Sequence, residues 1–137
     1  MLVLFALIIP VVFSIAGLVI DIGRALAMKI ELNRACMVAS EEATKEINMN
    51  LAQENGSNII DEDIGCVIEY YFYENISPSP NYEVSEIDFF ISGGNSNPMY
   101  LSVSCRASVE CIILKIFGID NIEVSSAGNG RLKGFLK

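Results

Sequence analysis

The first twenty residues of the chain carry no charged side chain, and this run limits the possible folds more than any other feature. They read MLVLFALIIPVVFSIAGLVI, and nearly all of the side chains are apolar. A helix needs about 20 such residues to cross the hydrocarbon core of a bilayer. The run therefore predicts a helix that lies in a membrane or in another environment from which water is excluded.

A cleaved secretory signal is the main alternative for this run. The apolar part of a signal peptide spans about 7–15 residues, follows a basic segment and ends near a small-residue cleavage site. Here the run is longer, no Lys or Arg precedes it, and no cleavage site stands out before Asp21. All nearby basic residues follow the run, which by the positive-inside rule would place the rest of the chain in the cytosol. We expect instead that a basic leader preceded Met1 and was removed.

The helical pattern continues beyond the uncharged run. Between Asp21 and Leu51 there is no proline, and the only glycine is Gly23. An apolar stripe recurs at steps of three or four residues, which is typical of one helix face. Its members are Met28, Leu32, Ala35, Ala39, Ala43 and Ile47. We therefore predict one long helix over residues 1–54, kinked near Pro10, in which residues 1–20 form the span and residues 21–54 are amphipathic.

After Gly56 the sequence period changes from about 3.6 to 2, which indicates strands. The segments CVIEYYFYE (66–74) and YEVSEIDFFIS (82–92) are rich in β-branched and aromatic residues, and MYLSVSCRASVEC (99–111) alternates strictly. The apolar connector IILKIFG (112–118) leads to a last strand over residues 122–134, which Gly128 and Gly130 are expected to fray.

These strands predict an α+β fold. Residues 55–137 form a small antiparallel β-domain of about four strands, which packs on the C-terminal half of the helix. A domain of this size is small for a core of its own, so the apolar helix face is expected to complete it.

The chain has four cysteines, at Cys36, Cys66, Cys105 and Cys111. No C-x-x-C pair is present, so a zinc site is not supported. An even number in a small domain suits two disulfides in an oxidising compartment, and buried free thiols are the alternative. If the strand is straight, Cys105 and Cys111 lie about 20 Å apart and each needs Cys36 or Cys66 as its partner. A turn near Val109 would instead allow a local Cys105–Cys111 bond.

Several classes of chemistry are excluded by composition. The chain has no histidine, which removes the commonest general base and metal ligand, and its net charge of −8 disfavours binding to phosphate backbones. No nucleophile elbow, phosphate-binding loop or dinucleotide motif is present. The acidic residues 61–63 lack the spacing of a calcium loop. We therefore expect no enzyme activity, no metal, no cofactor and no nucleic-acid partner.

The segment FALIIPVVFSIAGLVIDIGRALAMKIELNRA resembles the amino-terminal signature of TadE/TadG-like proteins of the tight-adherence (Tad) pilus, in the type IV pilin-like superfamily. In that family Phe-Ala-Leu leads into an apolar run with an early proline. An Asp-x-Gly-Arg follows the run, and a Leu-x-x-Ala lies further along the helix. The corresponding residues are 5–7, Pro10, Asp21–Arg24 and Leu32–Ala35. The match covers residues 4–43 well and residues 116–132 loosely.

The resemblance implies a pilin-like fold and a structural role. Such a pilin crosses the cell membrane once before assembly and then joins an extracellular filament, a helical homopolymer that serves cell adhesion. Its implied partners are copies of itself, the membrane, a prepilin peptidase and the pilus-assembly machinery. The β-domain would coat the filament. The residues expected to form the filament core are Leu2, Leu4, Phe5, Leu7, Ile8, Pro10, Val12, Phe13, Ile15, Ala16, Gly17, Leu18 and Ile20.

Asp21, Gly23 and Arg24 would form a collar where the helix leaves the core. One departure from the pattern is notable, since many pilins carry a glutamate near the start of the mature helix for subunit docking. In this chain no acidic residue precedes Asp21, which favours the TadG-like side of the family. Two alternatives therefore remain open. One is a minor pilin or pilus-assembly factor that stays membrane-anchored, and the other is a single-pass anchored binding domain that does not polymerise.

Overall fold

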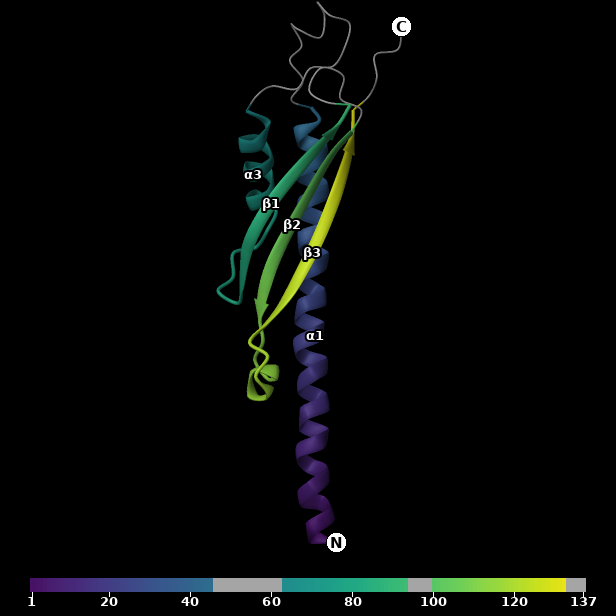
Figure 1. The fold of residues 1–137 in the computed structure, drawn as a ribbon, viewed down its shortest axis with the longest axis vertical. Helices are drawn as coiled ribbons and strands as arrows, with labels where there is room; N and C mark the ends of the chain where they lie inside the picture. The colour runs from purple at the N-terminus through teal and green to yellow at the C-terminus, as the bar shows by residue number, and fades with distance from the viewer. Residues whose placement is uncertain (46–62, 94–99, 133–137) are drawn as a thin grey trace, which may run out of the picture.

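One helix dominates the structure. The computed structural model describes the chain over residues 1–45, 63–93 and 100–132. Helix α1 (Leu2–Ala43) has 42 residues, about 63 Å at 1.5 Å per residue. Its N-terminal half extends below the rest of the molecule, and its C-terminal half packs against the remaining elements (Figure 1). The predicted α+β fold, a long N-terminal helix packed through its C-terminal half on a small antiparallel sheet, is confirmed.

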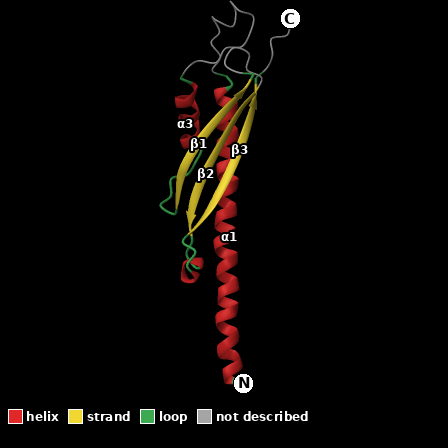
Figure 2. Cartoon of the chain, in the orientation of Figure 1, coloured by secondary structure: helices red, strands yellow, loops and turns green. Residues whose placement is uncertain are grey.

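The sheet has three strands among the described residues. Strands β1 (Tyr82–Ser92), β2 (Tyr100–Glu110) and β3 (Asn121–Arg131) pair antiparallel in the order β1-β2-β3. The short 3-10 helix η1 (Leu114–Phe117) connects β2 to β3. Helix α1 covers one face of the sheet and packs mainly on β3 and β2 (Figure 2).

The alternation predicted for β2 is confirmed. The buried side chains of this strand occupy every second position. They are Leu101, Val103, Cys105, Ala107 and Val109. These side chains join the core with the apolar stripe of α1, whose residues from Met28 to Ala43 are buried as predicted. One side of the central strand therefore supplies most of the sheet's contribution to the core.

The prediction of a strand at residues 66–74 is wrong, because this segment is helical. Helix α3 (Ile64–Glu74) packs beside α1. Its buried side chains, Ile64, Ile68 and Phe72, recur every four residues, whereas Cys66 and Tyr70 between them are exposed. A strand of period 2 would bury all five positions on one face, so the pattern fits a helix. The β-branched and aromatic composition indicated a strand, but such propensities are weaker than the burial pattern. The described part of the chain therefore has three strands where about four were predicted.

Helix α1 ends at Ala43, well before the predicted boundary at residue 54. The hydroxyl of Thr44 donates to the carbonyl of Glu41 at 2.6 Å, and the N–H of Lys45 donates to the carbonyl of Glu42 at 2.9 Å. These i to i−3 bonds tighten the last turn and end the helix. Residues 46–54 of the predicted helix lie outside the described residues. At the other end, α1 is helical on both sides of Pro10, so the proline does not break it.

The contact between α1 and β3 depends on two glycines. A Cβ atom on Gly128 would lie 2.4 Å from the backbone nitrogen of Met37, and one on Gly130 would lie 2.2 Å from the carbonyl oxygen of Ser40. Both glycines pair in register with β2, so the expectation that they fray the strand is wrong. Their lack of a side chain instead lets the strand backbone approach the helix backbone directly.

The four cysteines are free thiols. Cys105 and Cys111 are buried, and Cys66 on α3 is exposed. The sulfur atoms of Cys36 and Cys105 lie 3.1 Å apart between α1 and β2. The hydrogen bond to Cys105, together with burial, raises the pKa of the Cys36 thiol far above its usual value. The structure thus contains buried thiols and not the predicted pair of disulfides.

We predict that Gly128→Ala lowers the free energy of unfolding by about 1–3 kcal/mol, because the new methyl group meets backbone atoms that cannot move aside. The matched control is Gly23→Ala in α1, where a Cβ atom meets nothing within 4 Å. That control should raise stability by about 0.5–1 kcal/mol, since alanine favours helix. Denaturant unfolding of the full chain in detergent micelles measures both. Equal stability of the two variants would contradict the close contact.

Candidate assembly interface

The stem of α1, residues 1–20, has almost no contact with the rest of its own chain. Only 6% of the most apolar 18-residue window of α1 is buried, and the helix is long and apolar enough to cross a membrane. The predicted filament-core residues that are exposed in the structure are Leu4, Phe5, Leu7, Ile8, Pro10, Val12, Phe13, Ile15, Ala16, Leu18 and Ile20. The side chain of Leu2 lies outside the described part of the chain.

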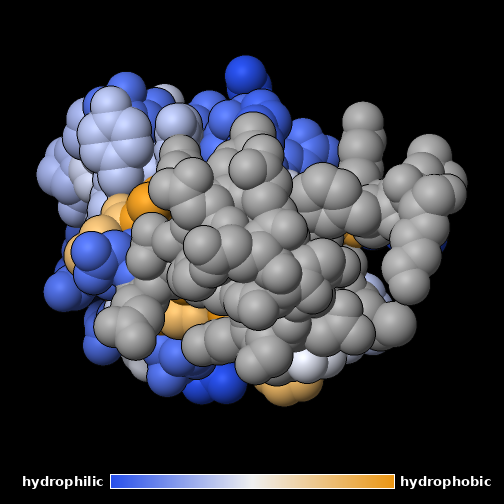
Figure 3. Space-filling view, turned by 90° about the horizontal axis from the view of Figure 1, so that it is seen from above, coloured by the Kyte–Doolittle hydropathy of each residue, from blue (hydrophilic) through white to orange (hydrophobic). Residues whose placement is uncertain are grey.

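This stem needs a partner other than water. Burying one large aliphatic or aromatic side chain is worth about 1.5–3 kcal/mol, and soluble monomers rarely expose a continuous apolar surface of this size. By contrast, the opposite end of the molecule shows mainly hydrophilic side chains around its rim (Figure 3). The polarity of the molecule therefore changes along its length, from an apolar stem to a polar domain.

The polar atoms within the stem are satisfied locally. The hydroxyl of Ser14 donates to the carbonyl oxygen of Pro10 at 2.7 Å. Such a bond to the preceding turn keeps a hydroxyl compatible with an apolar environment. Pro10 and Ser14 therefore allow the stem to lie in lipid or against other apolar helices.

Asp21, at the upper end of the stem, is buried, with 2% of its surface exposed. Its carboxylate accepts hydrogen bonds from the backbone N–H groups of Ile112 (3.1 Å), Ile113 (2.9 Å) and Leu114 (2.8 Å). These groups lie at the start of η1, where backbone N–H groups lack partners within the helix. The bond from Leu114 is the largest of the effects that hold the pKa of Asp21 below its usual value of 3.8. The predicted collar residue Asp21 is therefore buried and anchors the loop after β2 (Ile112–Ile119) to α1.

Arg24 supports the same junction. Its guanidinium donates to the carbonyl oxygen of Glu110 at 3.1 Å and lies 3.8 Å from the Asp21 carboxylate. The side chain thereby joins α1 to the lower end of β2. Gly23, the third predicted collar residue, is exposed, and nothing in the structure explains a glycine there.

Gly17 has a different role from the other predicted filament-core residues. It is buried, and a Cβ atom at this position would lie 2.1 Å from Cγ2 of Ile113. The loop after β2 therefore covers Gly17, one helical turn below Asp21. Gly17 is in contact with its own chain and is not free to contact another subunit in this conformation.

Sequence reasoning missed the contact between this loop and the stem. The sequence identifies residues 112–118 only as an apolar connector, yet several side chains of this segment are exposed beside the stem. The sequence did contain an indication of an apolar surface, because residues 111–119 include a single charged residue, Lys115. What the sequence did not show is that Asp21, about 90 residues earlier, holds the loop against the helix.

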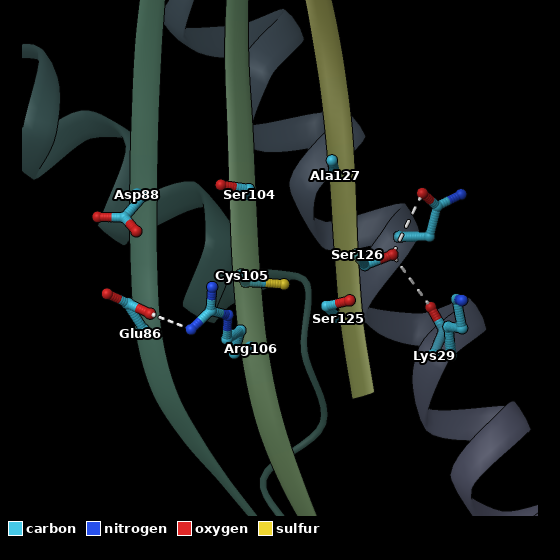
Figure 4. A pocket seen from close by; sticks show the side chains of 10 residues that line it. Lys29, Glu86, Asp88, Ser104, Cys105, Arg106, Ser125, Ser126 and Ala127 are labelled. Carbon is cyan, nitrogen blue, oxygen red and sulfur yellow. Dashed lines mark hydrogen bonds and ion pairs between the residues drawn. The ribbon is translucent and has the colours of Figure 1, made fainter. Parts of the chain in front are cut away.

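The structure also contains a polar pocket of about 470 Å³ that includes the solvent-facing side of the sheet. Figure 4 shows Glu86 directed toward Arg106, and their ion pair measures 3.3 Å. Ser126 donates to the Asn33 side chain at 3.3 Å. Both members of the ion pair are exposed. Within the described residues, no group of His, Cys, Asp or Glu is arranged to hold a metal ion.

No protein-family model matches the chain, and no match was found among curated proteins or solved structures. The likeness to TadE/TadG-like proteins therefore remains a resemblance in sequence motifs. The function has to be inferred from the stem, the Asp21 junction and the loop.

We predict that the loop after β2 detaches from α1 on acidification. Because the folded pKa of Asp21 is lowered, the carboxylate stabilises the junction fully above pH 3.8. This stabilisation is lost as the pH falls through the lowered folded value. Amide NMR shifts of Ile112–Leu114, followed by pH titration of the full chain in micelles, would report the change.

Two variants separate this effect from general acid unfolding. Asp21→Asn should release the same amides at neutral pH and speed their hydrogen exchange by roughly tenfold or more. The matched control, Asp88→Asn on an exposed position of β1, should leave them unchanged. Unchanged protection in Asp21→Asn would contradict the anchoring role.

Proposed function

We propose that this chain is a structural pilin subunit that polymerises through its stem into an extracellular Tad-like or type IV-like filament. The observation that carries the proposal is the continuity of α1. The exposed stem runs without a linker into the half of the helix that packs on the sheet. Because the stem is joined rigidly to the domain, the domain has the same orientation relative to the stem in every subunit. A helical polymer of identical subunits requires this equivalence.

Assembly would follow from burial of the stem. Before assembly the lipid bilayer would surround the exposed apolar side chains, and in the filament the stems of neighbouring copies would replace the lipid. Both environments exclude this surface from water, so the stem is stable in either, and close packing between stems would favour the filament over lipid. By resemblance, a prepilin peptidase and the pilus-assembly machinery would be the other partners.

A second candidate is a minor pilin or assembly factor that stays in the membrane. One observation favours it, because Asp21 is the first acidic residue of the chain and its carboxylate is engaged by backbone N–H groups of the same chain. This acid is therefore not available for docking to a neighbouring subunit.

A single-pass anchored binding domain that does not polymerise is the third candidate. The shearing experiment described next separates it from the first candidate.

We predict that shearing of cells that express the chain releases filaments composed of it. Negative-stain microscopy and mass spectrometry of the sheared material test this outcome. Recovery of the chain only in the membrane fraction would favour the second or third candidate.

Variants of the stem sharpen this test. A charge introduced by Ala16→Lys or Leu18→Asp should reduce filament yield at least about tenfold, because a charge is costly in an apolar core. The control Tyr70→Lys lies on an exposed position of α3 and should assemble normally. The amount of chain in the membrane fraction is measured in parallel, so that loss of insertion is not mistaken for loss of assembly. Unchanged filaments in both stem variants would refute the proposal.

An extracellular location also predicts the fate of the buried thiols. The sulfur atoms of Cys36 and Cys105 are 3.1 Å apart, whereas Cys66 is exposed. Oxidised glutathione should accept two electrons and two protons from this pair and leave as two molecules of reduced glutathione, and one Cys36–Cys105 disulfide should form. Peptide mapping without reduction would identify the bond. Cys36→Ser should abolish it, and an intact pair of thiols in filaments purified from cells would contradict the expectation.

A further inference from the structure

The loop after β2 carries an apolar surface that its own chain does not cover. Four large side chains are exposed on it: Ile112 (61%), Ile116 (80%), Phe117 (58%) and Ile119 (47%). The buried residue Leu114 and the contact of Ile113 with Gly17 hold the loop in place. The exposed side chains are therefore displayed by a docked segment. A surface patch of this kind marks a site of interaction.

The position of the loop beside the stem indicates the depth at which it would lie in a membrane. Ile113 contacts Gly17, which belongs to the uncharged run, and Asp21 binds the backbone of the loop just above that run. Figure 1 shows η1 beside α1, below the lower end of the sheet and on the side toward the stem. Gly17 and Asp21 are separated by about 6 Å along the helix axis. The loop therefore lies where the stem would leave the hydrocarbon core of a membrane.

The distribution of charged residues on the loop also fits a position at the edge of the hydrocarbon core. Lys115 is the only charged residue from Cys111 to Ile119, and its ammonium group pairs with the Glu110 carboxylate at 2.9 Å. The charged residues that flank the segment in sequence are Glu110 at the end of β2 and Asp120 just before β3. A lysine can extend to the lipid headgroups while neighbouring apolar side chains enter the layer beneath. The segment itself therefore carries a single charge, and the flanking charges lie where the chain leaves and re-enters the sheet.

From these observations we propose that the loop Ile112–Ile119 is a second membrane contact, in which its exposed apolar side chains enter the lipid interface beside the stem. The occupant is lipid, because the patch continues the apolar surface of the stem at the same depth. The contact would fix how the domain sits on the bilayer before assembly. It depends on membrane anchoring, which all three candidate functions share, and not on polymerisation.

The chain contains no tryptophan, so a single introduced indole reports its own surroundings. Phe117→Trp and Ile116→Trp place the indole on the loop, and both native side chains are exposed enough to tolerate the change. The matched control is Tyr73→Trp on α3, where the native side chain is 55% exposed. Each full-length variant is reconstituted into phosphatidylcholine–phosphatidylglycerol vesicles, with or without bromine on the upper part of the acyl chains.

Brominated lipid should quench the two loop variants by about twofold or more and shift their emission to the blue, as for an indole at the membrane interface. The control should be quenched instead by iodide in the aqueous phase. Iodide quenching of both loop variants without bromolipid quenching would overturn the proposal. Protection from both quenchers would also overturn it, because the loop would then pack against protein, such as a second copy of the chain.

A further variant tests the anchor. Asp21→Asn in the Phe117→Trp background should reduce bromolipid quenching, since the loop is no longer held at the level of Gly17. Asp88→Asn in the same background should have no effect. The filament yield is scored separately, so failure of the lipid contact and failure of polymerisation give different results.

Discussion

The hydrogen bonds between the Asp21 carboxylate and three backbone N–H groups are the interaction on which the rest of the structure depends. They join the end of the apolar stem to the connection between β2 and β3. A buried carboxylate is costly unless such donors surround it. Here the cost is offset by the N–H groups of Ile112 and Ile113, which precede η1, and of Leu114, its first residue. The junction thereby fixes the position of the β-domain relative to the stem.

Above this junction, small residues set the distance between helix and sheet. Gly128 and Gly130 let β3 lie directly against the backbone of α1, and the alanines of α1 complete the buried stripe. Contacts of this kind leave little freedom for the domain to swing on the helix. A rigid unit with one apolar end suits a subunit whose stem passes from lipid into a bundle of like stems. The same rigidity would hold the loop after β2 at one depth in the membrane.

Several parts of the structure could be predicted because a local pattern determines them. The apolar stem follows from the uncharged run, and the alternation of β2 follows from burial of one face of the strand. Residues 66–74 were mispredicted because their composition suits a strand, while Ile64, Ile68 and Phe72 have the spacing of a helix. Gly128 and Gly130 were interpreted as weak points, although they occupy the tightest contact. In both cases the deciding factor was the neighbouring surface of α1, which lies far away in sequence.

The sequence by itself determined that this chain has an apolar stem, an amphipathic helix and a small antiparallel sheet, because these depend on side-chain periodicity. Only the tertiary structure decided the roles of Asp21, Gly17 and the loop Ile112–Ile119. A local pattern identifies a carboxylate at the end of an apolar run only as a boundary charge, and an apolar connector only as a link between strands. Their contact joins residues about 90 positions apart, and no local pattern records which backbone N–H groups a carboxylate will meet.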